Sequence, residues 1–253
     1  MLLAAVLLCT GCAPRPTPGK LSIAAAADLQ FALEEVSRQF HAAHPEVETQ
    51  IVYGSSGNFY AQIRNQAPFD LFLSADLEYP RQLARQGLAL PDSVFPYAVG
   101  RLAVWVRADS PLDVAAMQMR AFDDPSVKHA AIANPQHAPY GRAAEAALRS
   151  AGVYDRIAGK LVLGENIAQT LQFVQSGAAD VGIVALSLAL APSMRGQGRY
   201  WEVPLNSYPK LWQGGVILKR AQGSRAAAAF RAYRGSAAGR RILQQYGFSL
   251  PDN

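Results

Sequence analysis

Four places in the sequence put small or polar residues directly before an expected helix. They are Ala27-Asp28, Ser55-Ser56-Gly57, Ala138-Pro139-Tyr140-Gly141 and Glu165-Asn166-Ile167. A helix start exposes unpaired backbone N–H groups and carries about half a positive charge, so it attracts anions. Helix capping explains each place taken alone. The four together predict a site where neutral donors surround one compact anion.

Sequence motifs for catalysis or for a resident metal are missing. His41 and His44 lie three residues apart, but no cysteine or carboxylate is spaced to complete a metal site with them. The chain has no Gly-x-Ser-x-Gly, His-Glu-x-x-His or Walker motif. Because a serine and a histidine can also meet in space, a secreted α/β hydrolase stays open as an alternative. We predict a binding protein with no catalytic residues and no metal ligands.

Alternating strands and helices must position these four places. Strands are expected at 21–26, 47–54 and 69–76, and again at 101–108, 129–136, 159–164, 179–186 and 212–220. The first helix carries an apolar stripe of Leu29, Leu33, Val36 and Phe40. Further helices are expected from Tyr79 to Gly87, over 141–151 and over 167–176, with others near the carboxyl end.

This alternation predicts an α/β fold with two lobes, each a mostly parallel sheet flanked by helices. The first lobe is expected to hold residues 21–99 and 206–253, and the second residues 100–205. Two chain crossings between the lobes leave a ligand cleft between them. The carboxyl ends of the strands, and with them the four helix starts, are expected to face this cleft.

Composition excludes some classes of partner. The 253 residues are 50% hydrophobic and 17% charged, with a net charge of +5. The basic residues are scattered, so we predict no nucleic-acid binding.

Residues 1–20 read as a lipoprotein-type signal and tether. The apolar run from Leu2 to Leu8 suits a secretion signal but is too short to span a bilayer. Gly11-Cys12 resembles a bacterial lipobox, which predicts cleavage before Cys12 and its lipidation. No basic residue precedes the apolar run, and Cys9 stands where Leu or Val is usual. We expect an exported protein, anchored to a membrane by lipid at Cys12.

At these motifs the sequence resembles the periplasmic molybdate-binding proteins, the receptors of molybdate ABC importers, which have the type II periplasmic-binding-protein fold. The motifs are "AAAADL" at 24–29, "YGSSGNFYAQIRNQAPFDLFLSAD" at 53–76, "ANPQHAPYGRAA" at 133–144, "GENIAQTL" at 164–171, "SGAADVGIVAL" at 176–186 and "YGFSLP" at 246–251. They occur in order and at family spacing over nearly the whole chain.

The resemblance implies a ligand, partners and site residues. The ligand would be molybdate or tungstate with no further cofactor, and the partner would be the membrane permease of an importer. The protein would be a periplasmic or extracytoplasmic monomer. The ligand-binding residues would be Ala27, Asp28, Ser56, Tyr140 and the backbone of Ile167. Some relatives have a further tyrosine where this chain has Ala185.

Asp28 departs from the Ser or Asn of several relatives, because an ionised carboxylate cannot donate a hydrogen bond to an anion. Either Asp28 turns away and caps its helix, or the ligand carries a proton for it to accept; we favour the cap. We expect Ser56 to face the ligand while Ser55 and the two flanking glycines shape the turn.

Two further functions remain as alternatives, one within the class of binding proteins and one outside it. One is a receptor for another tetrahedral oxyanion, such as sulfate or phosphate. Another is a surface lipoprotein with a structural or adhesive role.

Overall fold

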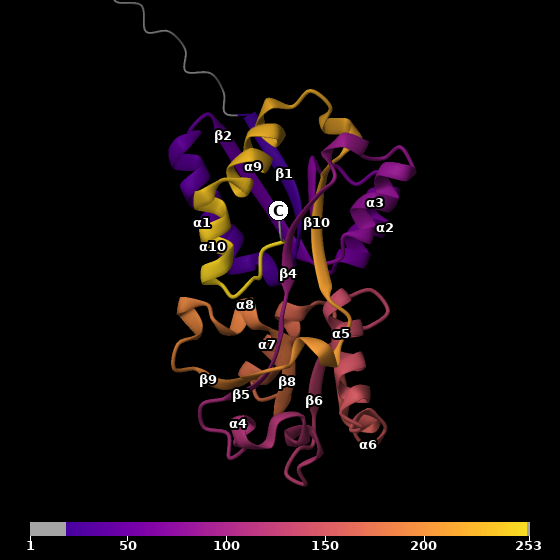
Figure 1. Ribbon diagram of the computed structural model, residues 1–253, viewed down its shortest axis with the longest axis vertical. Helices are drawn as coiled ribbons and strands as arrows, with labels where there is room; N and C mark the ends of the chain where they lie inside the picture. Colours follow the sequence, from indigo (N-terminus) through magenta and orange to yellow (C-terminus); the bar gives the residue numbers. More distant parts are fainter. Residues whose placement is uncertain (1–18, 252–253) are drawn as a thin grey trace, which may run out of the picture.

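The computed structural model describes residues 19–251. Within this range the chain forms two five-stranded sheets, each flanked by helices and stacked one above the other (Figure 1). The first sheet has the order β2-β1-β3-β10-β4, from β1 (Gly19–Ala26), β2 (Val47–Gly54), β3 (Leu71–Ser74), β4 (Phe95–Gly100) and β10 (Leu211–Ile217). The second has the order β7-β6-β8-β5-β9, from β5 (Leu102–Arg107), β6 (Ala130–Ala133), β7 (Leu161–Gly164), β8 (Val181–Ala185) and β9 (Gly198–Glu202).

One strand in each sheet runs against the other four. β10 is antiparallel to both β3 and β4, and β5 is antiparallel to both β8 and β9. The remaining pairs, β1 with β2 and β3 and β6 with β7 and β8, are parallel. The expected α/β fold of two mostly parallel sheets is therefore confirmed.

The sequence did not reveal β4 and β9, each of which lies at one edge of its sheet. β4 contains Pro96, and β9 is a short, partly exposed strand with little apolar alternation. Proline is tolerated at a sheet edge, where an N–H can stay unpaired. The alternation of apolar and polar residues that marks a half-buried strand is therefore weak in both segments.

Helices cover both faces of the first sheet. α1 (Gln30–Ala43), α9 (Arg225–Gly235) and α10 (Ala237–Gln245) pack together on one face, and α2 (Ser56–Arg64) and α3 (Glu78–Arg85) on the other (Figure 1). The predicted stripe Leu29, Leu33, Val36 and Phe40 is fully buried. Gly87 ends α3 as expected, in the left-handed conformation that glycine adopts without strain.

The second sheet carries α4 (Val114–Met117), α5 (Pro139–Ser150), α6 (Tyr154–Ile157), α7 (Ile167–Gln175) and α8 (Leu186–Ala189). α5 begins two residues before the expected start, since Pro139 is well suited to the first helical position. None of the helices in residues 19–251 is both long and apolar enough to cross a membrane.

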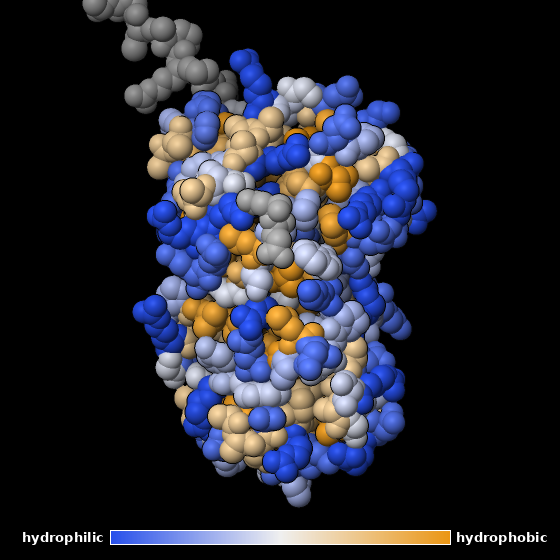
Figure 2. All heavy atoms as spheres, viewed as in Figure 1, coloured by the Kyte–Doolittle hydropathy of each residue, from blue (hydrophilic) through white to orange (hydrophobic). Residues whose placement is uncertain are grey.

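The chain passes from the first sheet to the second between β4 and β5 and returns between β9 and β10. The outline of the molecule narrows between the two halves (Figure 2). The two proposed lobes are residues 21–99 together with 206–253, and residues 100–205.

Candidate functional site

The five residues predicted to bind a ligand line one small cavity between the two sheets. Ala27, Asp28, Ser56, Tyr140 and Ile167 all contribute to its wall, and its volume is about 10 Å³. Such a space holds roughly one water molecule, so the two sides are drawn closely together here. The other wall residues are Ala26, Gly54, Ser55, Ala75, Ala138, Pro139 and Asn166. None of these described residues carries a positive charge.

Strand register brings the helix starts together. β1 and β2 end at the same level, with Ala26 opposite Gly54, so the turn η1 (Ala27–Leu29) and α2 begin side by side. In the second sheet Ala133 lies opposite Gly164, which likewise brings the segments that lead into α5 and α7 together. The two pairs of chain segments meet from opposite sheets at the cavity.

The start of α7 is a backbone donor site. Asn166 Oδ1 accepts hydrogen bonds from the N–H groups of Ala168 and Gln169, each at 3.0 Å. Ile167 follows the capping residue Asn166 and is the first residue of α7, so its N–H has no acceptor within the helix. It is available to a ligand in the cavity.

Ser56 is buried and keeps its hydroxyl proton free. Its Oγ accepts a hydrogen bond from the N–H of Ala75 at 2.9 Å. Since this contact uses an oxygen lone pair, the O–H can donate to an anion in the cavity. The expectation that Ser56 faces the ligand has this geometric support.

Ser55 bridges the two sheets, which differs from the expected role of shaping the turn. Its Oγ donates to the carbonyl oxygen of His137 at 2.6 Å, and His137 Nδ1 lies 3.0 Å from the same Oγ. Gly57 N–H donates to the same carbonyl at 2.9 Å. Although Ser55 holds the N-cap position of α2, its side chain makes no capping hydrogen bond within the described chain.

The expectation that Asp28 caps its own helix is wrong. Neither η1 nor α1 has a side-chain cap among residues 19–251. Asp28 Oδ2 instead accepts from Tyr140 Oη at 3.0 Å and from Gln213 Nε2 at 2.6 Å. Both donors come from segments more than 100 residues away along the chain. Asp28 is 1% exposed, so its carboxylate lies in the interior. There it accepts hydrogen bonds from these two distant donors and not from the start of its own helix.

Burial makes Asp28 an unusual carboxyl. It raises the pKa of Asp28 to about 6, although the hydrogen bonds from Gln213 and Tyr140 act in the opposite direction. Asp28 Oδ1 is buried and has no hydrogen-bond partner among the described residues. The hydroxyl of Tyr140 is committed to Asp28 here, so direct contact between Tyr140 and the ligand stays a prediction.

Sequence reasoning missed Gln213, which is fully buried in β10. It donates to Asp28 and also lies 3.2 Å from Tyr140 Oη. Gly100 makes room for this pair, since a Cβ there would overlap Tyr140 Oη and Gln213 Nε2. A lone glutamine inside an otherwise apolar strand was the available signal.

Ser187 is a second residue that the sequence did not single out. It lies on α8 and its Oγ donates to the backbone carbonyl of Asp28 at 2.7 Å. Ser187 lies two residues after Ala185. The family resemblance implies that some relatives have a tyrosine at the position of Ala185. Ala185 is fully buried and supplies no hydroxyl, so this side is tied to η1 through Ser187.

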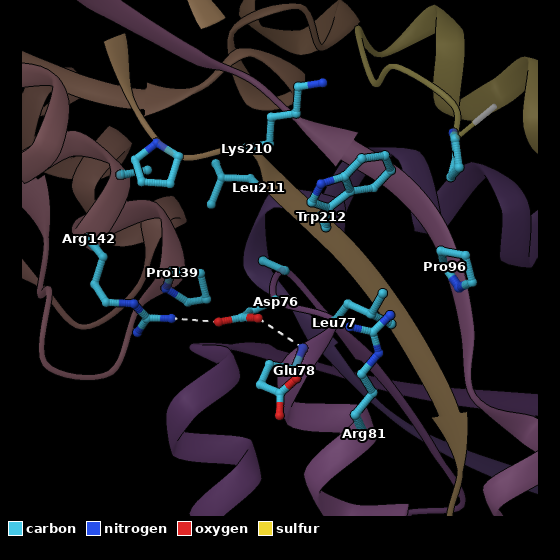
Figure 3. A pocket seen from close by; sticks show the side chains of 14 residues that line it. Asp76, Leu77, Glu78, Arg81, Pro96, Pro139, Arg142, Lys210, Leu211 and Trp212 are labelled. Atoms are coloured by element: carbon cyan, nitrogen blue, oxygen red, sulfur yellow. Dashed lines mark hydrogen bonds and ion pairs between the residues drawn. The ribbon is translucent and has the colours of Figure 1, made fainter. Parts of the chain in front are cut away.

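Ion pairs at the mouth of the cavity join the two sheets. Arg142 on α5 pairs with Asp76 after β3 at 2.8 Å (Figure 3). The Arg142 guanidinium also lies 5.9 Å from the centre of the Tyr79 ring. Arg142 thus bridges the two halves of the molecule. A groove of about 690 Å³ opens beside this pair and includes Lys210 and the half-exposed Trp212 (Figure 3).

A second set of contacts gathers around Glu165. Asn58 Nδ2 donates to Glu165 Oε2 at 3.2 Å, and His137 Nε2 lies 3.7 Å from the same carboxylate. No group of His, Cys, Asp and Glu residues that could hold a metal ion occurs in residues 19–251.

Comparisons with known proteins agree with this architecture. The family model of bacterial extracellular solute-binding proteins matches residues 21–249. The molybdate-binding protein ModA of Azotobacter vinelandii is 35% identical over 91% of this chain and 90% of its own length. That of Rhodobacter capsulatus is 34% identical over 96% of this chain and 94% of its own.

A solved structure shows the same fold. The periplasmic molybdate-binding protein of Azotobacter vinelandii superposes with a TM-score of 0.85 at 33% identity, covering 92% of this chain and all of that one. The cavity, its four helix starts and these similarities lead to one conclusion: the chain belongs to the family of bacterial extracellular solute-binding proteins.

Proposed function

We propose that this protein is the extracytoplasmic receptor of an ABC importer and binds molybdate or tungstate in the cavity between its sheets. The observation that carries the proposal is a small, partly open cavity lined by helix starts and hydroxyls, with no cationic side chain among its described wall residues. Because this cavity is smaller than an oxyanion, the two halves must move apart to admit the ligand. Backbone dipoles of this kind suit a compact dianion. The molybdate-binding relatives, up to 35% identical over most of this chain, support the choice of ligand.

We assign the binding residues as follows. Ala27 and Ile167 donate through their backbone N–H groups, and Ser56 donates through its hydroxyl. Asp28 and Tyr140 complete the wall at the base of α5. No cofactor is needed beyond the oxyanion itself, because binding and release involve no covalent chemistry.

Another oxyanion remains the main alternative. A calorimetric panel of molybdate, tungstate, sulfate and phosphate decides between them. Molybdate and tungstate should bind with similar affinity, since they are unprotonated dianions of nearly the same size. Sulfate binding as tightly as molybdate would contradict the proposed ligand.

Replacing Ser56 tests the site itself. Ser56→Ala removes a donor to a charged ligand, an interaction worth about 1.5–3 kcal/mol, so affinity should fall roughly 10- to 150-fold. Ser150→Ala, exposed at the end of α5, is the matched control and should bind as the parent does. Equal affinities of the two variants would remove Ser56 from the site.

The contact between Ser55 and His137 is the one observation that favours an enzyme. The hydroxyl of Ser55 donates to the His137 carbonyl, so Nδ1 meets an oxygen whose proton already points elsewhere. This arrangement does not prepare the histidine to remove that proton, as a general base must. We therefore propose a non-enzymatic receptor; turnover of ester or phosphoester substrates would contradict it.

We also propose export and lipid anchoring at Cys12, which lies outside the described residues. A membrane-bound protein that becomes soluble on Cys12→Ala substitution is the expected result in cells. The importer's permease is the proposed partner, and the receptor is proposed to act as a monomer, which sedimentation at micromolar concentration can check.

A further inference from the structure

Asp28 lines the cavity, but a site made only of hydrogen-bond donors does not explain why a carboxylate lies there. It is 1% exposed, and it lines the cavity with its Oδ2 already held by Tyr140 and Gln213. Its other oxygen, Oδ1, is buried without a partner among the described residues. An unpartnered buried oxygen is costly, and the proposed anion brings only further oxygens to it.

Within residues 19–251, no cationic side chain is paired with Asp28. Burial and hydrogen bonds account for its shifted titration, and no nearby charge contributes to the shift. An ionised Asp28 beside a dianion would therefore meet strong, uncompensated repulsion in a site of low dielectric. A single proton placed between Oδ1 and an oxygen of the anion removes this repulsion and gives Oδ1 a hydrogen-bonding role.

We infer that Asp28 and the bound oxyanion share one proton, so that the site takes up a fully ionised dianion together with one H⁺. The inference rests on the proposed function, because it concerns the same cavity. The proton comes from the buffer, and no other bond forms or breaks. The charges sum to −2 for aspartate, dianion and proton together, whichever of the two oxygens holds the hydrogen.

The other titratable groups near Asp28 do not account for such uptake. Burial raises the pKa of Tyr140 and of Tyr97 well above the usual value, so both phenols stay protonated. The titratable side chains on the neighbouring elements have partners of their own: Glu35 with Arg38, Arg101 with Glu202, and His137 with Glu165. Glu34 is exposed on α1. His137 is therefore the group that the test must separate from Asp28.

The pH profile follows from the titration of Asp28. Its pKa of about 6 means that the carboxyl is already neutral in more acidic solution, so binding there needs no extra proton. Above that pH every bound dianion must bring in one proton. The affinity for molybdate should then fall about tenfold per pH unit, or about 100-fold between pH 7 and pH 9.

Calorimetry on the full-length protein tests this directly. Molybdate is titrated at pH 5.5, 7 and 8.5 in buffers of different ionisation enthalpy, which gives the number of protons taken up. We expect nearly one at pH 8.5 and only about a quarter of one at pH 5.5, because a carboxyl with a pKa of about 6 is already mostly protonated there.

Asp28→Asn is the matched variant, because its amide donates without titrating. It should bind molybdate with the same affinity from pH 7 to pH 9 and more tightly than the parent at pH 8.5. His137→Gln and Asp76→Asn should keep the parent's pH slope. A slope that survives in Asp28→Asn, or that disappears in His137→Gln, would overturn the assignment to Asp28.

Molybdate binding by the unsubstituted protein also tests the shared proton, even if a variant fails to fold. Tight molybdate binding with no pH slope and no dependence on the buffer would overturn the shared proton and leave the proposed function intact. Absence of molybdate binding at every pH would overturn both.

Discussion

At the scale of single residues, Asp28 carries the largest energetic consequence. Its pKa is raised from 3.8 to about 6 by burial, so the folded state holds the proton more tightly than the unfolded chain. The two states bind protons equally below pH 3.8. As pH rises through 6 the folded protein loses stability, by about 3 kcal/mol for a shift of roughly two units.

Asp28→Asn should therefore stabilise the ligand-free protein at neutral and alkaline pH. The uncharged amide avoids the burial penalty and still accepts a hydrogen bond from Tyr140. Thermal unfolding should show a higher midpoint than the parent at pH 8 and nearly the same midpoint at pH 4. The exposed Asp92→Asn is the control and should not change with pH in this way. A gain of the same size at both pH values would contradict burial as the cause.

At the scale of elements, the contact of α2 with the loop before α5 decides how closely the two sheets approach. Gly57 lies in the first turn of α2, and a Cβ there would come within 2.5 Å of His137 O and 3.0 Å of its Cα. The glycine is thus required by close approach of backbone to backbone rather than by an unusual backbone conformation. Ser55 and Gly57 together fasten α2 to this loop.

Gly57→Ala should weaken ligand binding without harming the fold. The added methyl holds the sheets apart, and overpacking of this kind costs about 1–3 kcal/mol, or roughly 5- to 150-fold in affinity. Alanine favours a helix over glycine, so the ligand-free protein should unfold at the same temperature or higher. Gly159→Ala, which has open space around its Cβ position, is the control for calorimetry. An unchanged affinity in Gly57→Ala would show that closure tolerates the methyl.

At the scale of the whole molecule, contacts across the mouth hold the two halves closed. Buried hydrogen bonds from Tyr140 to Asp28 and from Ser187 to the Asp28 carbonyl link the two halves. The outer pair of Arg142 and Asp76 adds a link that is 41% and 33% exposed. Receptors of this kind bind by closing two lobes around a ligand, so these contacts set how long the closed state lasts.

Arg142→Ala should speed ligand release modestly. An exposed ion pair contributes about 0–1 kcal/mol, which limits the increase in the dissociation rate to roughly fivefold, and added salt should shrink the difference. Stopped-flow fluorescence can follow release, since Trp212 lies in the groove beside this pair. Arg149→Ala removes an ion pair within α5 and should leave the rate unchanged. Equal rates for the two variants would show that the bridge does not hold the halves closed.

The sequence by itself determined the features that depend on neighbours along the chain. The alternation of apolar strands with helices predicted the fold class, and the small or polar residues after Ala26, Gly54 and Gly164 marked helix starts correctly. Family motifs pointed to the same positions. These signals are local, because strand burial and helix initiation depend on residues only a few positions apart.

Only the tertiary structure decided what Asp28, Ser55 and Gln213 do. Asp28 looked like a helix cap because capping is the best local use of an aspartate. Its actual partners, Tyr140 and Gln213, lie 112 and 185 residues away. The carbonyl that Ser55 binds lies 82 residues away in the facing half. The choice of hydrogen-bond partner and the burial of a carboxyl follow from which surfaces meet in space, and no spacing along the chain records that.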